Sequence, residues 1–281
     1  MPDAPGTVSR ILWHFTGGPR WNEIENRQLR NRKSAVDAYQ ALLGILQTRT
    51  LKLGHYQEVV KVRVPKVRYY NRATKRFNIK RNVLRSLKSV AVCCLADIPV
   101  LHLSYQASRY GKFAVGFHRE AAIRHGFNPV FYTLQDTNVI QSIYRGFAEI
   151  QALDADSVRT AAGEVESELK ERNVDVWSEL LDIDIAADDI ETAVDSVRHS
   201  IEEFLAFVKT IDRKEFGTVY CEREWRATKT FTFERDDIAM IVLPGKVGAE
   251  KYFASFVATE VKRLHLPRSI PIVPWEDLVE S

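Results

Sequence analysis

The chain has 281 residues, of which 45% are apolar and 27% are charged, and these proportions are ordinary for a globular protein. No apolar run reaches the ~18 residues that a membrane-spanning helix needs, and the start of the chain lacks the pattern of a signal peptide. The three cysteines show no metal-ligand or disulfide spacing. We therefore expect a cytoplasmic protein with no membrane partner and no metal site.

Charge is distributed unevenly along the chain. Residues 49–88 contain thirteen Lys or Arg and one acid, a net charge of +12. Residues 149–203 contain seventeen Asp or Glu and four bases, a net charge of −13. Segments of such opposite charge can attract each other within one chain. They can also attract the opposite segment of a second copy in a homo-oligomer, or outside partners.

Strands and helices alternate in the first part of the chain. We expect a strand over residues 9–16, closed by two glycines, and a helix over residues 34–48 with Ser34 as its N-cap. Residues 59–81 alternate valines with cations, and they predict a protruding basic β-hairpin with its tip in the segment YNRATKR. Further short strands and helices follow, including a helix that ends at Gly111.

The character of the sequence changes near residue 137. Residues 137–212 combine helical periodicity with the excess of acids and predict an inserted helical block, which ends in the amphipathic segment IEEFLAFVKTI. Residues 217–233 alternate strictly and predict a strand, with more strands and a helix after it. The order of elements predicts an α+β fold with a mixed or antiparallel sheet. The expected domains are a discontinuous core, residues 1–136 and 213–281, which includes the hairpin, and the acidic helical insertion.

Two clusters of polar residues could carry chemistry. His14 and Thr16 lie two residues apart in the segment ILWHFTGG, so a strand would project both side chains to the same face. Glu222, Glu224 and Arg226 would share one face of the late strand for the same reason. Two carboxylates beside an arginine are too polar for a dry core. The alternative is a solvated strand face on which the arginine pairs with a neighbouring acid.

The basic hairpin interleaves cations with aromatic rings. This pattern suits single-stranded nucleic acid, because phosphates pair with cations and bases stack on rings. Two alternatives stay open: a docking surface for the acidic segment of this chain or of a second copy, and a plain solvated face. The candidate nucleic-acid-binding residues are Arg63, Lys66, Arg68, Tyr69, Tyr70, Arg72, Lys75 and Arg76.

Several segments together resemble the abortive-infection AbiGi family of bacterial phage-defence proteins. They are WHFTGG, GILQTRTLKL, CCLADIP, HLSYQASRYGKFAVGFHREAAIRHGFNPVFY and EREWR. The resemblance covers residues 10–135 and 215–275 and skips the acidic helical block. It implies a protein that works with a partner of a defence system, and the family name has been attached to an antitoxin-like component of toxin–antitoxin pairs.

The layout is also similar, more distantly, to the ADP-ribosyltransferase fold at its DarT-like end, although the second-strand Ser-Thr-Ser pattern is missing. This similarity implies NAD as substrate, Glu224 as the essential carboxylate and Glu222 as an acid that orients the acceptor. It requires His14 and Glu224 to meet across one cleft. The positions that it assigns to cofactor binding are His14, Thr16, Arg109, Tyr110 and Arg226.

Two functions remain open at this point. One is an enzyme with an ADP-ribosyltransferase-like core that transfers ADP-ribose from NAD to a macromolecule, such as nucleic acid, or hydrolyses NAD as a glycohydrolase. The other is a non-catalytic antitoxin-like or regulatory protein that binds a partner through the basic hairpin and the acidic helices.

Overall fold

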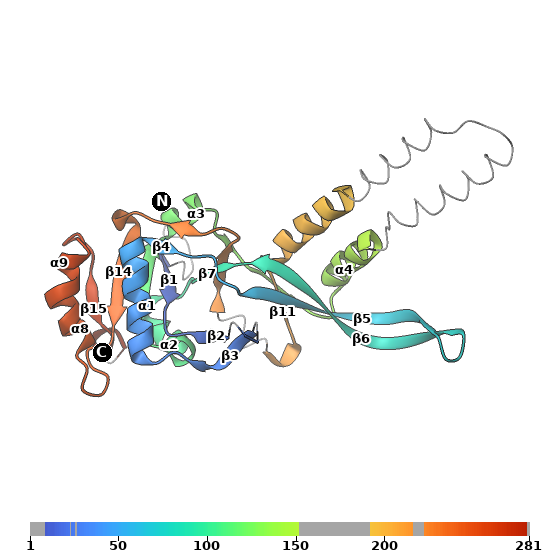
Figure 1. The fold of residues 1–281 in the computed structure, drawn as a ribbon, viewed down its shortest axis with the longest axis horizontal. Helices are drawn as coiled ribbons and strands as arrows, with labels where there is room; N and C mark the ends of the chain where they lie inside the picture. Colours follow the sequence, from blue (N-terminus) through green and yellow to red (C-terminus); the bar gives the residue numbers. More distant parts are fainter. Residues whose placement is uncertain (1–8, 23, 26, 152–191, 216–221, 280–281) are drawn as a thin grey trace, which may run out of the picture. The chain divides into compact units, whose positions relative to one another are not determined.

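The structure is a computed structural model in which the chain forms two compact units (Figure 1). The first unit comprises residues 1–58, 91–132 and 213–281, and the second comprises residues 59–90 and 133–212. The basic hairpin, which the sequence analysis grouped with the core, thus falls within the second unit. The described residues are 9–22, 24–25, 27–151, 192–215 and 222–279.

A mixed sheet of seven strands forms the centre of the first unit (Figure 1). The strand order is β15-β14-β8-β1-β7-β12-β9, and only β14 and β15 run parallel. The predicted α+β class with a mixed sheet is confirmed. The strands are β1 (Ile11–Phe15), β7 (Cys93–Ala96), β8 (Ala114–His118), β9 (Asn128–Pro129), β12 (Glu224–Ala227), β14 (Ile238–Leu243) and β15 (Ile272–Pro274).

Helices and two small strand pairs complete the described part of the first unit. Strands β2 and β3 pair with each other, as do β4 and β13. The helices are α1 (Ala35–Thr48), α2 (Leu103–Tyr110), α3 (Arg119–Arg124), α8 (Tyr252–Ser255), α9 (Val261–Arg263) and α10 (Trp275–Val279), and the small strands are β2 (Pro19–Asn22), β3 (Arg27–Arg32), β4 (Thr50–Leu51) and β13 (Phe231–Thr232).

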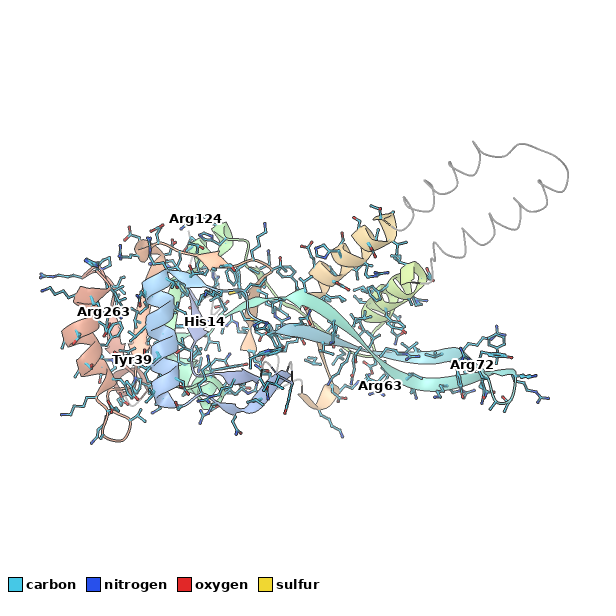
Figure 2. The ribbon with its side chains drawn as sticks, in the orientation of Figure 1. His14, Tyr39, Arg63, Arg72, Arg124 and Arg263 are labelled. Atoms are coloured by element: carbon cyan, nitrogen blue, oxygen red, sulfur yellow. The ribbon has the colours of Figure 1, made fainter. Side chains whose placement is uncertain are left out.

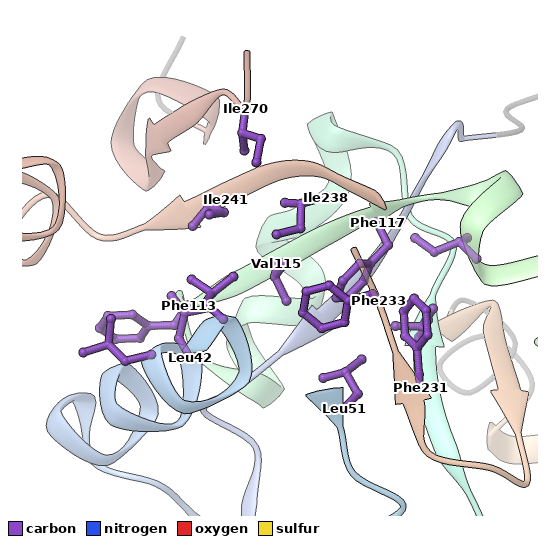
Figure 3. Packing of buried hydrophobic residues seen from close by; sticks show 14 of the residues in the cluster. Leu42, Leu51, Phe113, Val115, Phe117, Phe231, Phe233, Ile238, Ile241 and Ile270 are labelled. Atoms are coloured by element: carbon purple, nitrogen blue, oxygen red, sulfur yellow. The ribbon is translucent and has the colours of Figure 1, made fainter. Parts of the chain in front are cut away.

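Alternation along the strands sorts the core into two layers. Leu12 of β1 packs with α1 and with Val115 and Phe117 of β8, in a cluster rich in phenylalanine (Figure 3). Trp13 points to the opposite face and packs with Leu103 of α2 and Trp275 of α10. The sheet is therefore covered on both faces, with α1 on one side and α2 and α10 on the other.

Local chemistry explains where α1 begins and ends. The Ser34 hydroxyl accepts a hydrogen bond from the backbone N–H of Asp37 at 3.1 Å, which satisfies one unpaired donor of the first turn. Arg49 follows the helix with a left-handed φ of 52°. The predicted start and end of this helix are confirmed.

The second unit is built on a long hairpin. Its strands are β5 (Gln57–Asn71) and β6 (Arg76–Ala91), and they extend beyond the predicted residues 59–81. At the tip, the Asn71 side chain accepts hydrogen bonds from the N–H groups of Ala73 and Thr74 at 3.0 and 3.3 Å. This side chain–backbone turn is what an asparagine at this position favours.

Helices cover the base of the hairpin. Val60 and Val62 are completely buried and pack with Ile140 of α4 (Asn138–Gln151) and with Leu205 of a helix over residues 192–205. Two short strands, β10 (Phe131–Leu134) and β11 (Val208–Ile211), form a separate pair. The alternation of buried valines with outward cations in β5 is confirmed.

Two predicted elements are wrong in extent. The segment IEEFLAFVKTI is helical only to residue 205, because Val208–Ile211 pairs with β10 as a strand. The long strand over residues 217–233 is limited to β12 and β13 in its described part, since Arg223 has a φ of +43° that interrupts the extended chain. Residues 217–221, including Cys221, lie outside the described residues.

Candidate functional site

Glu224 belongs to a buried ion cluster. The guanidinium of Arg226 has 0% exposure and contacts a carboxylate oxygen of Glu224 and one of Glu58, both at 2.5 Å. The Tyr56 hydroxyl donates to Glu58 at 3.0 Å. Burial lowers the pKa of Arg226, but the attraction of nearby acids, with Glu224 the strongest, outweighs burial and raises this pKa overall. The sequence placed Glu224 and Arg226 on one face of a strand, and in the structure they form an ion pair in which each side chain stabilises the charge of the other.

Glu222 does not share a strand face with Glu224 and Arg226, so this part of the prediction is wrong. The left-handed φ of Arg223 turns the chain just before β12 begins. Glu222 is buried and forms an ion pair with Arg109 of α2. Arg109 also lies 5.9 Å from the ring centroid of Tyr105. The structure therefore brings together two of the predicted site residues, Glu222 and Arg109, through a contact that strand periodicity did not indicate.

A cavity of about 570 Å³ has Glu224 in its wall. It lies at the end of the sheet where β7 and β8 finish, and Asp97 is one of its charged lining residues. Asp97 Oδ2 accepts from Arg119 at 3.0 Å and from Arg223 at 3.1 Å, while its buried Oδ1 has no hydrogen-bond partner among the described residues. The backbone N–H of Glu224 donates to the Tyr132 hydroxyl at 2.9 Å.

This Asp97 cluster was not predicted from the sequence. Its members come from the ends of β7 and β8 and from the start of β12, which are far apart in the chain. The available signal was a charged residue directly after each buried strand, in the segments CCLADIP and VGFHRE.

His14 projects from β1 toward the α1 layer and is held by the neighbouring strand. Its Nδ1 lies 3.2 Å from the carbonyl oxygen of Cys94. A carbonyl can only accept, so Nδ1 carries the hydrogen and Nε2 is left as an acceptor. Burial lowers the pKa of His14 to about 4, although the Cys94 carbonyl opposes this shift, so the ring is neutral at pH 7.

Thr16 and the glycine after it have structural contacts in this fold. The Thr16 side chain is buried and donates to the Ala38 carbonyl oxygen in α1 at 2.7 Å. A Cβ on Gly17 would lie 2.6 Å from the carbonyl oxygen of Tyr110, so only glycine fits where the chain leaves β1. The Tyr110 ring centroid lies 6.4 Å from that of Phe15. These contacts tie the end of β1 to α1 and to the end of α2.

The register of the sheet separates His14 from Glu224. Trp13 and Glu224 are both register partners of Ala96, and directly paired residues of an antiparallel sheet project to the same face. Glu224 therefore shares a face with Trp13, in the α2 layer, whereas His14 projects into the α1 layer with Leu12. The expectation that His14 and Glu224 meet across one cleft is wrong.

The hairpin carries cation–aromatic contacts on both faces. On one face Arg68 lies 4.1 Å from the Phe77 ring centroid, and the Tyr70 ring lies 5.2 Å from that of Phe77. On the other face the Lys80 ammonium lies 4.8 Å from the Tyr69 ring centroid. The Phe77 and Tyr70 side chains are 59% and 50% exposed, so both rings present surface to solvent.

The hairpin cations lack acidic partners within the described structure. Residues 59–81 contain nine Lys or Arg and no acid. No ion pair to these cations occurs among the described residues. Figure 2 shows Arg72 at the far end of the hairpin and Arg63 nearer its base. The positive charge of these residues is therefore not neutralised by acids within the described structure, and their role in binding nucleic acid stays a prediction.

No helix in the described part is long and apolar enough to cross a membrane. Within the same residues, no group of three or more His, Cys, Asp or Glu side chains is arranged to hold a metal ion.

The comparisons with known proteins assign the chain to a family. The model of the family described as "Putative abortive phage resistance protein AbiGi, antitoxin" matches residues 57–273, which is most of the chain. The chain belongs to this phage-defence family. The match includes the helical segment that the sequence resemblance skipped, and it begins after His14 and Thr16. Comparisons with curated proteins and with solved structures found no match.

Proposed function

We propose that this chain is a non-catalytic, antitoxin-type binding protein of phage defence, and that its hairpin binds single-stranded nucleic acid. The observation that carries the proposal is the pairing of cations with exposed rings along the hairpin, at Arg68 and Phe77 on one face and at Lys80 and Tyr69 on the other. The family supplies the phage-defence context.

The chemistry of this surface fits a nucleic-acid strand. Phosphates spaced along a strand release counterions when they pair with successive Lys and Arg side chains. Phe77 and Tyr70 offer ring faces on which bases stack, and stacking contributes about 1–3 kcal/mol per base. A surface meant only for solubility needs the charges but not the exposed rings.

The test measures binding of a fluorescent twenty-nucleotide poly(dT) by anisotropy at several salt concentrations. The hairpin variant replaces Arg72, Lys75 and Arg76 with alanine. We expect much weaker binding and a salt-dependence slope smaller by about 2, from ~0.7 per lost phosphate contact. Phe77→Leu should weaken binding without changing that slope, because it removes stacking and no charge.

A matched control removes three exposed lysines of the first unit, Lys52, Lys229 and Lys262. This control changes net charge by the same amount and should bind poly(dT) nearly as the unchanged protein does. Equal losses in the control and in the hairpin variant would overturn the proposal, as would absence of binding at low salt. Binding that emerges only after the acidic segment is neutralised would support the alternative, in which the hairpin docks on the chain's own acids.

ADP-ribosyl transfer from NAD is the second candidate, because Glu224 lines a cavity of about 570 Å³. A carboxylate beside the nicotinamide ribose would stabilise the cation that forms as nicotinamide leaves. The position of His14 on the other sheet face and the ion pair of Glu224 with Arg226 weigh against this candidate.

Labelled NAD, with and without total nucleic acid, separates the two functions. Nicotinamide release or label transfer that disappears in Glu224→Gln but persists in Glu250→Gln would establish the enzyme. Undiminished turnover in Glu224→Gln would remove the assignment of this carboxylate. Absence of turnover in the unchanged protein would leave the binding function alone.

A further inference from the structure

A second cavity, of about 710 Å³, lies at the opposite end of the seven-stranded sheet from the Glu224 cavity. Strands β1, β14 and β15 end there and β8 begins there, as their registers show. We call it the strand-end cavity. Its volume falls within the ~300–1,000 Å³ that is typical of small-molecule sites.

Four cations from three separate stretches of the chain line the strand-end cavity. One pair precedes α1, one residue lies between α2 and β8, and one follows β14. No Asp or Glu occurs among the described residues that line it. The four cations are Arg32, Lys33, Lys112 and Lys246. Like charges that converge without a counter-charge repel one another, so an anion in this cavity is stabilised.

Two carboxylates that lie next to lining residues in the sequence have other partners. Asp37, in the first turn of α1, forms an ion pair with Arg20. Glu276, next to the cavity-lining Trp275, accepts a hydrogen bond from the backbone N–H of Gly245 at 2.7 Å. No ion pair joins either carboxylate to the four cations within the described structure. The positive charge of the cavity is therefore not neutralised by the chain's own described acids.

Two of the four cations are held in place by the backbone. Arg32 Nη1 donates to the carbonyl oxygens of Ala107 and Ser108 at 3.2 and 3.0 Å. Lys33 Nζ donates to the carbonyl oxygen of Thr16 at 3.2 Å. Burial lowers the pKa of Lys33, and a neighbouring arginine lowers it further, so an adjacent phosphate would restore this pKa upward. These contacts fix the charges before a ligand arrives, which reduces the entropic cost of binding.

The rest of the cavity lining is mostly apolar, with Ser104 and Ser108 as its polar members. Phe113, Pro244 and Trp275 contribute hydrophobic surface beside the cations. A lining that combines four cations with apolar surface suits a molecule that joins phosphates to a flat ring system. We propose that the strand-end cavity binds a nucleotide, with its phosphates on the four cations and its base against the apolar wall.

The test uses the full chain in the hairpin variant with Arg72, Lys75 and Arg76 replaced by alanine, which weakens polyanion binding to the hairpin. Calorimetry measures the affinity for ATP, AMP, adenosine and inorganic phosphate. We expect ATP to bind more tightly than AMP, and both to bind at least about tenfold more tightly than adenosine or inorganic phosphate. Bound ATP should also raise the Tm of the protein.

Substitutions then locate the site. Lys246→Ala, in an exposed stretch after β14, and Lys33→Ala should each weaken ATP binding by about tenfold. Lys229→Ala, which removes an equal charge outside the cavity, should leave the affinity unchanged. The circular dichroism spectrum and Tm without ligand verify that each variant folds.

Three results would overturn the proposal. The first is equal affinity for AMP and inorganic phosphate, which would indicate an anion site only. The second is an equal effect of Lys246→Ala and Lys229→Ala on ATP affinity. The third is no ATP binding at millimolar concentration. Tight binding of a 5′-phosphorylated oligonucleotide without binding of free nucleotides would assign the cavity to nucleic-acid ends instead. Loss of poly(dT) binding by the hairpin leaves this proposal intact, since the cavity is lined by residues of the first unit alone.

Discussion

The partly buried imidazole of His14 makes the stability of the first unit depend on pH. Its pKa is about 4 in the folded chain against 6.5 for an ordinary histidine. The folded state therefore binds fewer protons than the unfolded state between these values, and the free energy of unfolding falls as the pH drops through this window. The difference between these two pKa values corresponds to about 3 kcal/mol of stability.

His14→Asn isolates this contribution. Asparagine keeps an N–H donor for the Cys94 carbonyl but does not titrate. Urea unfolding is followed by tryptophan fluorescence at pH 7.5, 5.5 and 4.5, because Trp13, Trp225 and Trp275 all lie in the first unit. Between pH 6.5 and pH 4 the unchanged protein should lose about 1.4 kcal/mol more stability per pH unit than the variant.

A second variant, His102→Asn, changes an exposed histidine and serves as the control. This variant keeps His14, so its stability should still fall as the pH drops through the same window. Contributions from carboxylates cancel when the three proteins are compared at each pH. Parallel pH curves for the His14 variant and the unchanged protein would refute the reasoning, because they would mean that His14 has the same pKa in the folded and unfolded states.

Three further predictions concern stability and are tested by thermal unfolding. Gly17→Ala should destabilise the fold by about 1–3 kcal/mol, since its Cβ would lie 2.6 Å from the Tyr110 carbonyl oxygen, whereas Gly44→Ala in α1 meets nothing within 4 Å and should raise the Tm. Arg226→Met leaves the carboxylates of Glu58 and Glu224 without their shared cation and should cost about 3–5 kcal/mol. Ser34→Ala removes the N-cap of α1 and should cost about 1 kcal/mol, and an unchanged Tm would show that the cap contributes nothing.

Local patterns in the sequence predicted the elements whose shape depends on their own residues. The start of α1 follows from Ser34, and the buried valines of β5 follow from strict alternation. His14 shares a face with Leu12, while Trp13 packs on the other side, as the period of a strand requires. These features depend on contacts between residues close in the chain, so one sequence suffices to predict them.

The relation between distant strands could not be obtained in this way. Whether His14 and Glu224 share a sheet face depends on the register of β7, which lies between β1 and β12. A shift of one residue in that register would move Glu224 to the other face. Alternation within each strand carries no information on this offset. The left-handed φ of Arg223 likewise depends on its place before β12 and not on a glycine or asparagine signal.

The two cavities could not be predicted from the sequence either, because they too depend on how distant strands are arranged. Arg32, Lys112 and Lys246 are separated by long stretches of chain, and only the meeting of four strand ends brings them together. Asp97 and Arg119 likewise follow different strands. Charges next to strand ends are common, so their convergence becomes visible only once the strand order is known.

The hairpin leaves the first unit and returns to it at a single point, where the N–H of Val92 donates to the carbonyl oxygen of Tyr56 at 3.0 Å. The length of the hairpin can therefore be changed by deleting residues from both strands. Deleting an even number of residues from each strand shortens its reach and keeps every remaining ring and cation on its original side. Deleting an odd number inverts the two sides. The length of the hairpin and the side on which its rings and cations lie can thus be varied separately in engineered versions of this protein.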